Sequence, residues 1–89
     1  MKTGRVPCCV PFCGRTAPDR GDGAEILCGK HWRLVRRTLR RRHAWAVRRW
    51  GAALARGDIA AADRAGRLED VIWRAIKRQA IEISAGISG

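Results

Sequence analysis

Two long segments of the chain carry apolar residues at the spacing of one face of an α-helix. Between residues 39 and 54 the apolar side chains share a single arc of the helical wheel, and arginines occupy much of the remaining circumference. An apolar arc of this kind is normally buried against a neighbouring element. The residues that we expect to be buried are Leu39, His43, Ala46, Val47, Trp50, Ala53 and Leu54.

A second amphipathic segment runs from Ile59 to about Ser84, and Gly57 and Asp58 separate it from the first. Gly57 can adopt the left-handed conformation that ends a helix, and Asp58 can cap the helix that follows. The two segments are therefore predicted to form an antiparallel helical hairpin with a tight turn. The second apolar stripe consists of Ala61, Ala65, Leu68, Ile72, Trp73, Ala75, Ile76, Ala80 and Ile83.

The second helix is neutral, with five basic and five acidic residues from position 57 onward. Asp63 with Arg67 and Asp70 with Arg74 are spaced as i,i+4 ion pairs. Gly66 weakens this helix by roughly 1 kcal/mol relative to alanine, which would favour a break there. A two-helix core is thin, so the N-terminal segment or a second copy of the chain must cover the rest. We therefore expect a monomer or a homodimer.

The first 29 residues have a different composition, rich in Gly, Pro and Cys, with a turn-forming run over residues 17–23. Such a segment cannot build a core by itself, and a chain of 89 residues has little apolar interior to share. A helix that begins near Gly29 would turn Cys28 and His31 toward the same side. The potential metal ligands of the segment form two groups, Cys8, Cys9 and Cys13, then Cys28 and His31.

Three thiols and an imidazole suit a tetrahedral zinc ion, and metal binding would then supply much of the folding free energy of this module. The preferred ligands are Cys8, Cys13, Cys28 and His31, although a set that begins at Cys9 is nearly as good. Two disulfides are the competing assignment. The N-terminus lacks the apolar stretch of a secretory signal, which favours a reducing compartment, and adjacent cysteines would pair poorly.

Two short motifs surround these ligands, Cys8-x4-Cys13-Gly14-Arg15 and Leu27-Cys28-x2-His31-Trp32-x-Leu34. Over residues 6–36 they resemble the small treble-clef-like zinc-finger modules of phage and bacteria. Such modules occur as stand-alone proteins and as appendages of HNH-type homing endonucleases. The resemblance implies the same four ligands and a phage or prophage origin. The chain departs from the pattern in the additional Cys9 and in the loop from Pro18 to Glu25.

The basic residues are concentrated in one part of the chain. Nineteen Lys and Arg against eight Asp and Glu give a net charge of +11, and residues 30–56 hold ten basic residues and no acidic one. A GC-rich genome would also favour arginine over lysine, but base composition would not confine the excess to one segment. The distribution therefore indicates a polyanionic partner.

Nucleic acid, either DNA or RNA, is the partner that we expect, because guanidinium groups pair bidentately with phosphates and an exposed indole can stack on a base. The alternative is an accessory or inhibitor subunit that docks its arginine face on an acidic surface of a larger nucleic-acid machine or a virion component. A merely solvated face is the third interpretation. The expected nucleic-acid contacts are Arg33, Arg36, Arg37, Arg40, Arg41, Trp45, Arg48 and Arg49.

Catalysis is not expected, because the chain has no Asn or Tyr and only two histidines, one of which is assigned to the metal. No stretch reaches the ~18 apolar residues of a membrane span, so we expect a protein of the bacterial cytoplasm without membrane contact. The sequence thus predicts a predominantly α-helical protein. Its zinc-stabilised module would occupy residues 1–34, and a helical hairpin with one basic and one neutral helix would occupy residues 35–89.

Overall fold

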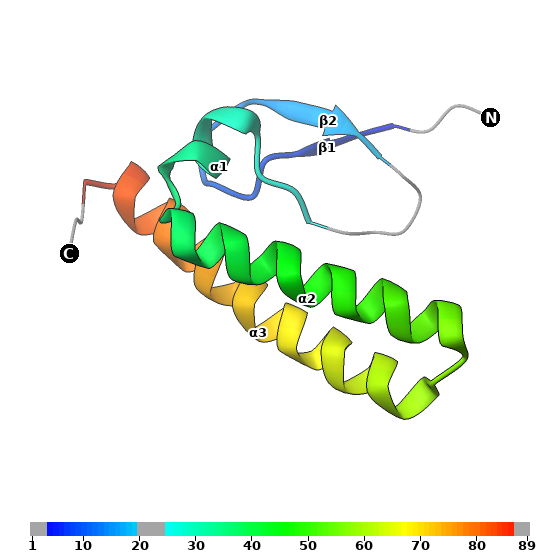
Figure 1. The fold of residues 1–89 in the computed structure, drawn as a ribbon. Helices are drawn as coiled ribbons and strands as arrows, with labels where there is room; N and C mark the ends of the chain where they lie inside the picture. Colours follow the sequence, from blue (N-terminus) through cyan, green and yellow to red (C-terminus); the bar gives the residue numbers. More distant parts are fainter. Residues whose placement is uncertain (1–3, 20–24, 87–89) are drawn as a thin grey trace. The chain divides into compact units, whose positions relative to one another are not determined.

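The computed structural model describes residues 4–19 and 25–86 and is mostly helical, with one small two-stranded antiparallel sheet (Figure 1). The helical fold class predicted from the sequence is therefore confirmed. Among the described helices, none has the length and apolar character that crossing a membrane requires. In chain order the elements are β1 (Arg5–Pro7), β2 (Thr16–Pro18), α1 (Gly29–Leu34), α2 (Arg37–Arg56) and α3 (Ile59–Ser84).

The described residues divide into two compact units. The N-terminal unit contains the residues up to Leu34 together with those from Lys77 onward, and the hairpin unit contains Val35–Ile76. The end of α3 thus belongs by its contacts to the N-terminal unit, although its sequence pattern predicted that it belongs to the helical hairpin. The division of the chain into domains at residue 34 stays a prediction.

In the N-terminal unit, β1 and β2 pair in antiparallel register with Val6 opposite Ala17. The Arg5 side chain donates from Nε to Thr16 Oγ1 at 2.7 Å across this short ladder. A parallel bridge joins Cys8 to Ile26. Through these pairings the stretch that carries Cys8 lies beside the stretch that leads to Cys28.

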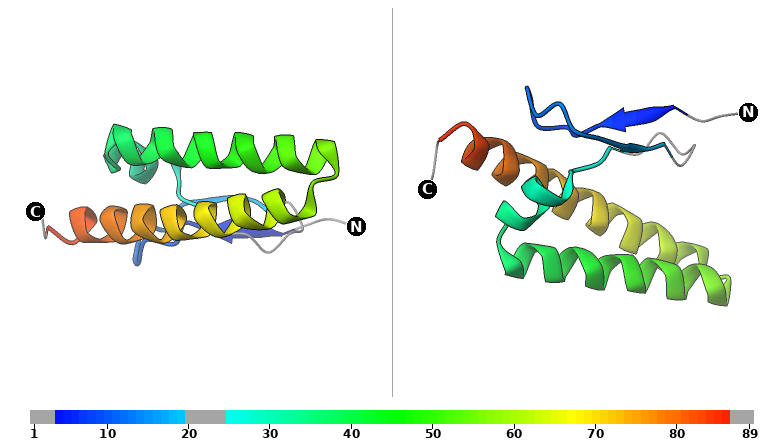
Figure 2. Two further views of the ribbon diagram at one scale, coloured as in Figure 1. Left: turned by 60° about the horizontal axis from the view of Figure 1, so that its bottom comes forward. Right: turned by 90° about the horizontal axis from the view of Figure 1, so that it is seen from above.

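In the hairpin unit, α2 and α3 run antiparallel and side by side (Figures 1 and 2). Gly57 ends α2 in the left-handed conformation at φ 74°, with its amide bonded to the carbonyl of Leu54 at 3.0 Å. The amide of Asp58 reaches back to the carbonyl of Ala53 at 2.9 Å. This pattern is a Schellman-type ending, which satisfies carbonyls that the helix leaves without partners. The predicted turn at Gly57 and Asp58 is present.

The interior of the hairpin unit consists mainly of small residues. Ala46 and Ala53 of α2 are fully buried, as is Ile76 of α3, and Ala62 and Ala65 are buried beside them. Small side chains let two helices approach closely. A half-buried polar contact adds to this strip: His43 pairs with Glu69 across the two helices at 2.7 Å, and its ring lies 6.0 Å from that of Trp73.

The predicted buried arc of α2 is wrong along one edge. Val47, Trp50 and Leu54 are 40%, 42% and 51% exposed, and Leu68 on α3 is also exposed. Two helices in contact cover only a narrow strip of each surface, whereas the apolar arc was about a third of the circumference. The apolar residues at its edge therefore remain open within the described structure.

Helix α3 is continuous through Gly66, so the glycine does not break it. The two expected ion pairs on its exposed face are present, with Arg67 and Asp63 at 2.6 Å and Arg74 bonded to Asp70. Exposed pairs of this kind add only a few tenths of a kcal/mol each. Packing against α2 is therefore the main source of stability of this helix in the hairpin unit.

Replacement of Gly66 by alanine is expected to stabilise the protein. A Cβ at this position would lie 3.8 Å from Trp50 Nε1, which is an ordinary van der Waals distance. Glycine inside a helix costs about 0.5–1 kcal/mol relative to alanine. We expect Gly66→Ala to raise the free energy of unfolding by that amount, measured by urea denaturation followed by circular dichroism. Gly57→Ala is the matched control and should lower it, because φ at Gly57 is 74°.

Asp58, the N-cap of α3, makes the free energy of unfolding depend on pH in the acid range. The amide of Ala61 donates to Asp58 Oδ1 at 3.0 Å, and this bond, aided by Arg56 and Arg64, holds the pKa of Asp58 below its ordinary value of 3.8. The stabilisation is present above the unfolded pKa and is lost as pH falls through the lower folded value. Asp58→Ala should therefore lower the urea midpoint at neutral pH, and the difference from the wild type should narrow in the acid range.

Asp58→Asn serves as the control for this measurement, because asparagine keeps a capping oxygen without the charge. Its difference from the wild type should be small at neutral pH. A deficit of Asp58→Ala that stays constant across the acid range would contradict the role assigned to the carboxylate.

Candidate metal centre and arginine face

The local structure of the N-terminal unit presents four ligand side chains from two places. Cys8 directly follows β1, and Cys13 lies beyond the turn that begins at Val10. Cys28 directly precedes α1, and its carbonyl accepts the amide of Trp32 at 2.9 Å. This helical bond places His31 one turn after Cys28, so both side chains face the same side, as the spacing predicted.

A tight knuckle brings Cys13 back toward Cys8. The amide of Cys13 bonds to the carbonyl of Val10 at 3.2 Å, and Phe12 and Gly14 adopt left-handed conformations at φ 65° and 77°. The amide of Cys8 bonds to the carbonyl of Arg15 at 2.8 Å and closes the knuckle at its base. The chain therefore reverses between the two cysteines.

The four ligand atoms lie within 4.8 Å of one another. The sulfurs of Cys13 and Cys28 are 3.8 Å apart, and Nδ1 of His31 lies 3.6 Å from Cys8 Sγ and 3.2 Å from Cys28 Sγ. A tetrahedral ion with bonds of about 2.3 Å to sulfur and about 2.0 Å to nitrogen requires S···S and S···N separations of about 3.8 and 3.5 Å. These four residues are arranged to hold a metal ion.

The cluster is largely shielded from solvent and its sulfurs differ in acidity. Cys8, Cys28 and His31 are buried and Cys13 is half-buried. Desolvation opposes ionisation of Cys28, but hydrogen bonds from the His31 amide and from the His31, Cys13 and Cys8 side chains outweigh it and lower the pKa of Cys28 to about 6. The Arg15 amide favours the Cys13 thiolate, yet desolvation and its contacts with Cys28 and Cys8 raise the pKa of Cys13. Cys28 is therefore the first of these two thiols to ionise.

The structure distinguishes Cys8 from Cys9. Cys8 lies in the cluster, and the amide of Cys28 also points at its sulfur at 3.4 Å. Cys9 lies outside the cluster, with its amide bonded to the carbonyl of Ile26 at 3.0 Å. Burial and the neighbouring Cys8 and Glu25 raise the pKa of the Cys9 thiol, which keeps it protonated. Cys8 is therefore the first residue of the ligand cluster.

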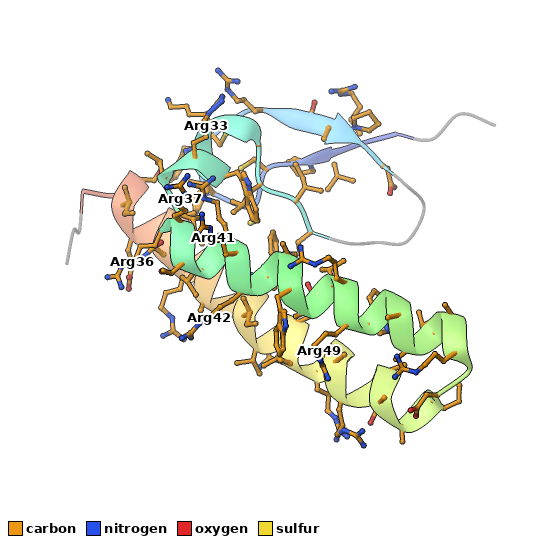
Figure 3. All side chains as sticks on the ribbon, viewed as in Figure 1. Arg33, Arg36, Arg37, Arg41, Arg42 and Arg49 are labelled. Atoms are coloured by element: carbon orange, nitrogen blue, oxygen red, sulfur yellow. The ribbon has the colours of Figure 1, made fainter. Side chains whose placement is uncertain are left out.

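Most of the second group of predicted site residues lies on α2 (Figure 3). Trp45 is 45% exposed, and the guanidinium of Arg49 lies 5.1 Å from the centre of its ring. Arg40 is half-buried and donates from Nε to the carbonyl of Val35 at 3.1 Å, so it is partly engaged in the fold. Arg33 is exposed on α1 in the N-terminal unit. The remaining predicted arginines, all exposed in the hairpin unit, are Arg36, Arg37, Arg41, Arg48 and Arg49.

Arg42 belongs to this exposed set, although it was not among the arginines predicted from the sequence. It precedes Arg49 by seven residues, which is two helical turns, so the two side chains lie on one face of α2. That spacing was the signal that could have found it. We call the exposed arginines of α2 the arginine face; they are Arg37, Arg41, Arg42, Arg48, Arg49 and Arg56.

Comparison of the chain with protein-family models, with curated proteins and with solved structures finds no match. The resemblance to treble-clef-like modules stays a prediction.

Metal binding by the cluster can be tested with cobalt as a spectroscopic probe. We expect reduced protein to bind Co²⁺ with the thiolate charge-transfer bands of a sulfur-rich tetrahedral site. Cys13→Ser should lose these bands or weaken binding about tenfold or more, because it removes one of the four ligands. Cys9→Ser is the matched control and should bind as the wild type does. Equal loss in both variants would contradict the assigned ligand set.

Proposed function

We propose that the chain is a small zinc protein that binds nucleic acid through its phosphates, with the arginine face of α2 as the main contact surface. The proposal has two parts, a structural zinc ion in the N-terminal unit and a phosphate-binding surface on the hairpin unit. Each part is supported by its own observations and can fail separately.

Zinc is the metal that the donor set favours. Three thiols and one imidazole in tetrahedral arrangement suit zinc better than magnesium or calcium, which prefer oxygen ligands. The protein supplies all four ligands, as structural zinc sites do, whereas catalytic zinc keeps a position for water. We therefore assign the ion a structural role and the protein a non-enzymatic one.

The observation that carries the nucleic-acid proposal is the largely unpaired charge of the arginine face, in which Arg56 pairs with Asp58 at 3.7 Å. Helix α2 holds seven arginines and no acidic residue. Among the described residues, Arg37, Arg41 and Arg48 form no ion pair, whereas Arg67 and Arg74 of α3 each have an aspartate. Like charges on one helix repel each other, and phosphates would relieve that repulsion.

Trp45 adds a surface on which a base can stack. Its indole is nearly half exposed, and the Arg49 guanidinium beside it offers donors to a phosphate. Stacking of a base on an aromatic side chain contributes about 1–3 kcal/mol and does not depend on the base sequence. The combination favours binding that recognises the backbone and the planar bases without reading a particular sequence.

The proposal predicts a steep and measurable salt dependence. The logarithm of the association constant for labelled DNA or RNA should fall linearly with the logarithm of the salt concentration. The slope should be about −0.9 for each neutralised phosphate on duplex DNA and about −0.7 on single strands. Replacing Arg41 or Arg48 by alanine should make that slope shallower by about the amount that one phosphate contact contributes. Arg67→Ala removes the same charge from an arginine that pairs with Asp63, and should leave the slope nearly unchanged.

Weak binding that is equal for duplex, single strand and heparin, and that disappears by physiological salt, would overturn the nucleic-acid proposal. The arginine face would then belong to an acidic protein surface. Capture experiments with the wild type and with Trp45→Ala would test that alternative, because a protein interface concentrates its affinity in a few aromatic and arginine residues.

A further inference from the structure

The tip of the knuckle carries an aromatic residue that the fold does not use. Phe12 is fully exposed and has φ 65°, the left-handed conformation that favours glycine. A bulky residue is rare there, because its side chain crowds the backbone. Phe12 therefore adds strain without burying apolar surface, and glycine would serve the turn better. Residues held in such conformations occur mainly at functional sites.

A cavity of about 430 Å³ lies beside this ring and is lined entirely by residues of the N-terminal unit. Its volume falls in the range of small-ligand sites. Pro11 and Phe12 give it an apolar wall, and Ile81 of α3 adds apolar surface. Arg15 and Lys30 also line it, and the described lining includes no carboxylate.

The charges at this cavity are available to a ligand. Arg15 and Lys30 are exposed, and neither forms an ion pair among the described residues. The site therefore combines a fully accessible ring with two cationic side chains. A nucleotide presents the complementary features, a planar base and an anionic phosphate. The bases of a duplex are already stacked on one another, so the ring could be reached only by an unpaired base.

We infer that Phe12 and its cavity bind an unpaired nucleobase by stacking, and that Arg15 and Lys30 hold the flanking phosphates. This inference rests on the proposed nucleic-acid binding and names its substrate class as single-stranded. It adds a contact site on the N-terminal unit that is separate from the arginine face.

The test compares two oligonucleotides of equal length, oligothymidine and an abasic strand that has the same phosphates but no bases. Fluorescence anisotropy measures the affinity of the zinc-loaded protein for each. The wild type should prefer oligothymidine by about fivefold or more, as expected for one stacked base. Because Trp45 can stack a second base, Phe12→Gly is also introduced into Trp45→Ala, where it should lose most of the remaining preference and keep the affinity for the abasic strand.

Phe12→Gly also suits the left-handed backbone, so it should fold at least as well as the wild type, which circular dichroism and zinc content would check. Phe12→Leu is the matched variant that keeps apolar bulk and removes the aromatic face; it should lose the preference as Phe12→Gly does. Trp45→Ala is measured in parallel, and its loss of preference gives the contribution of stacking on Trp45 in the hairpin unit.

Three results would overturn the inference. Full retention of the wild-type preference in Phe12→Gly would show that bases stack elsewhere. Equal affinity of the wild type for both strands would exclude stacking while leaving phosphate binding intact. Absence of binding to either strand at low salt would overturn the proposed function as well.

Discussion

Convergence of four side chains that are arranged to hold a metal ion is the feature on which the N-terminal unit depends, because the unit has almost no other described interior. Apart from Cys8, Cys28 and His31, its described buried residues are Val10 and Ala80. Burial of one valine contributes about 1.5–3 kcal/mol, whereas structural zinc contributes about 10–16 kcal/mol in small finger modules. The strands are three residues long and α1 has six, so these elements gain little stability from their own hydrogen bonds, and the ion that we propose would be their main source of stability.

The hairpin unit is stabilised in a different way. Its helices are long, its turn satisfies the end of α2, and alanines allow close packing between the helices. The charge of α2 opposes this stability, since its arginines lie close together without acidic neighbours on the same helix. The chain therefore retains a repulsive surface on which, among the described residues, Arg56 alone of the arginine face has an acidic partner, Asp58 at 3.7 Å. A polyanionic ligand would relieve the remainder.

Each of the two units presents an exposed aromatic ring together with cationic side chains. Trp45 has Arg49 beside it on the hairpin unit, and Phe12 has Arg15 and Lys30 at its cavity on the N-terminal unit. In both places an exposed aromatic ring is combined with cations, which suits a ligand with planar bases and a charged backbone. A structural ion is compatible with this arrangement, because a metal-closed knuckle can hold an exposed aromatic residue in an unfavourable conformation.

Much of this architecture follows from local pattern. The 3.6-residue periodicity predicted both helices, Gly57 with Asp58 predicted the turn, and the spacing of Cys28 and His31 predicted that they share one side of a helix. These features depend on neighbours in sequence. The choice of Cys8 over Cys9 depends on the pairing of Cys9 with Ile26, which is distant in sequence.

Burial and side-chain exposure likewise depend on contacts between residues that are distant in sequence. The width of the contact strip between α2 and α3 decides that Trp50 and Leu54 stay exposed, and a helical wheel contains no information about that width. The left-handed conformation and full exposure of Phe12 likewise follow from the closure of the knuckle around the ligands. Local spacing determined which residues can converge, and only tertiary contact decided which of them are buried, which join the ligand cluster and which remain accessible.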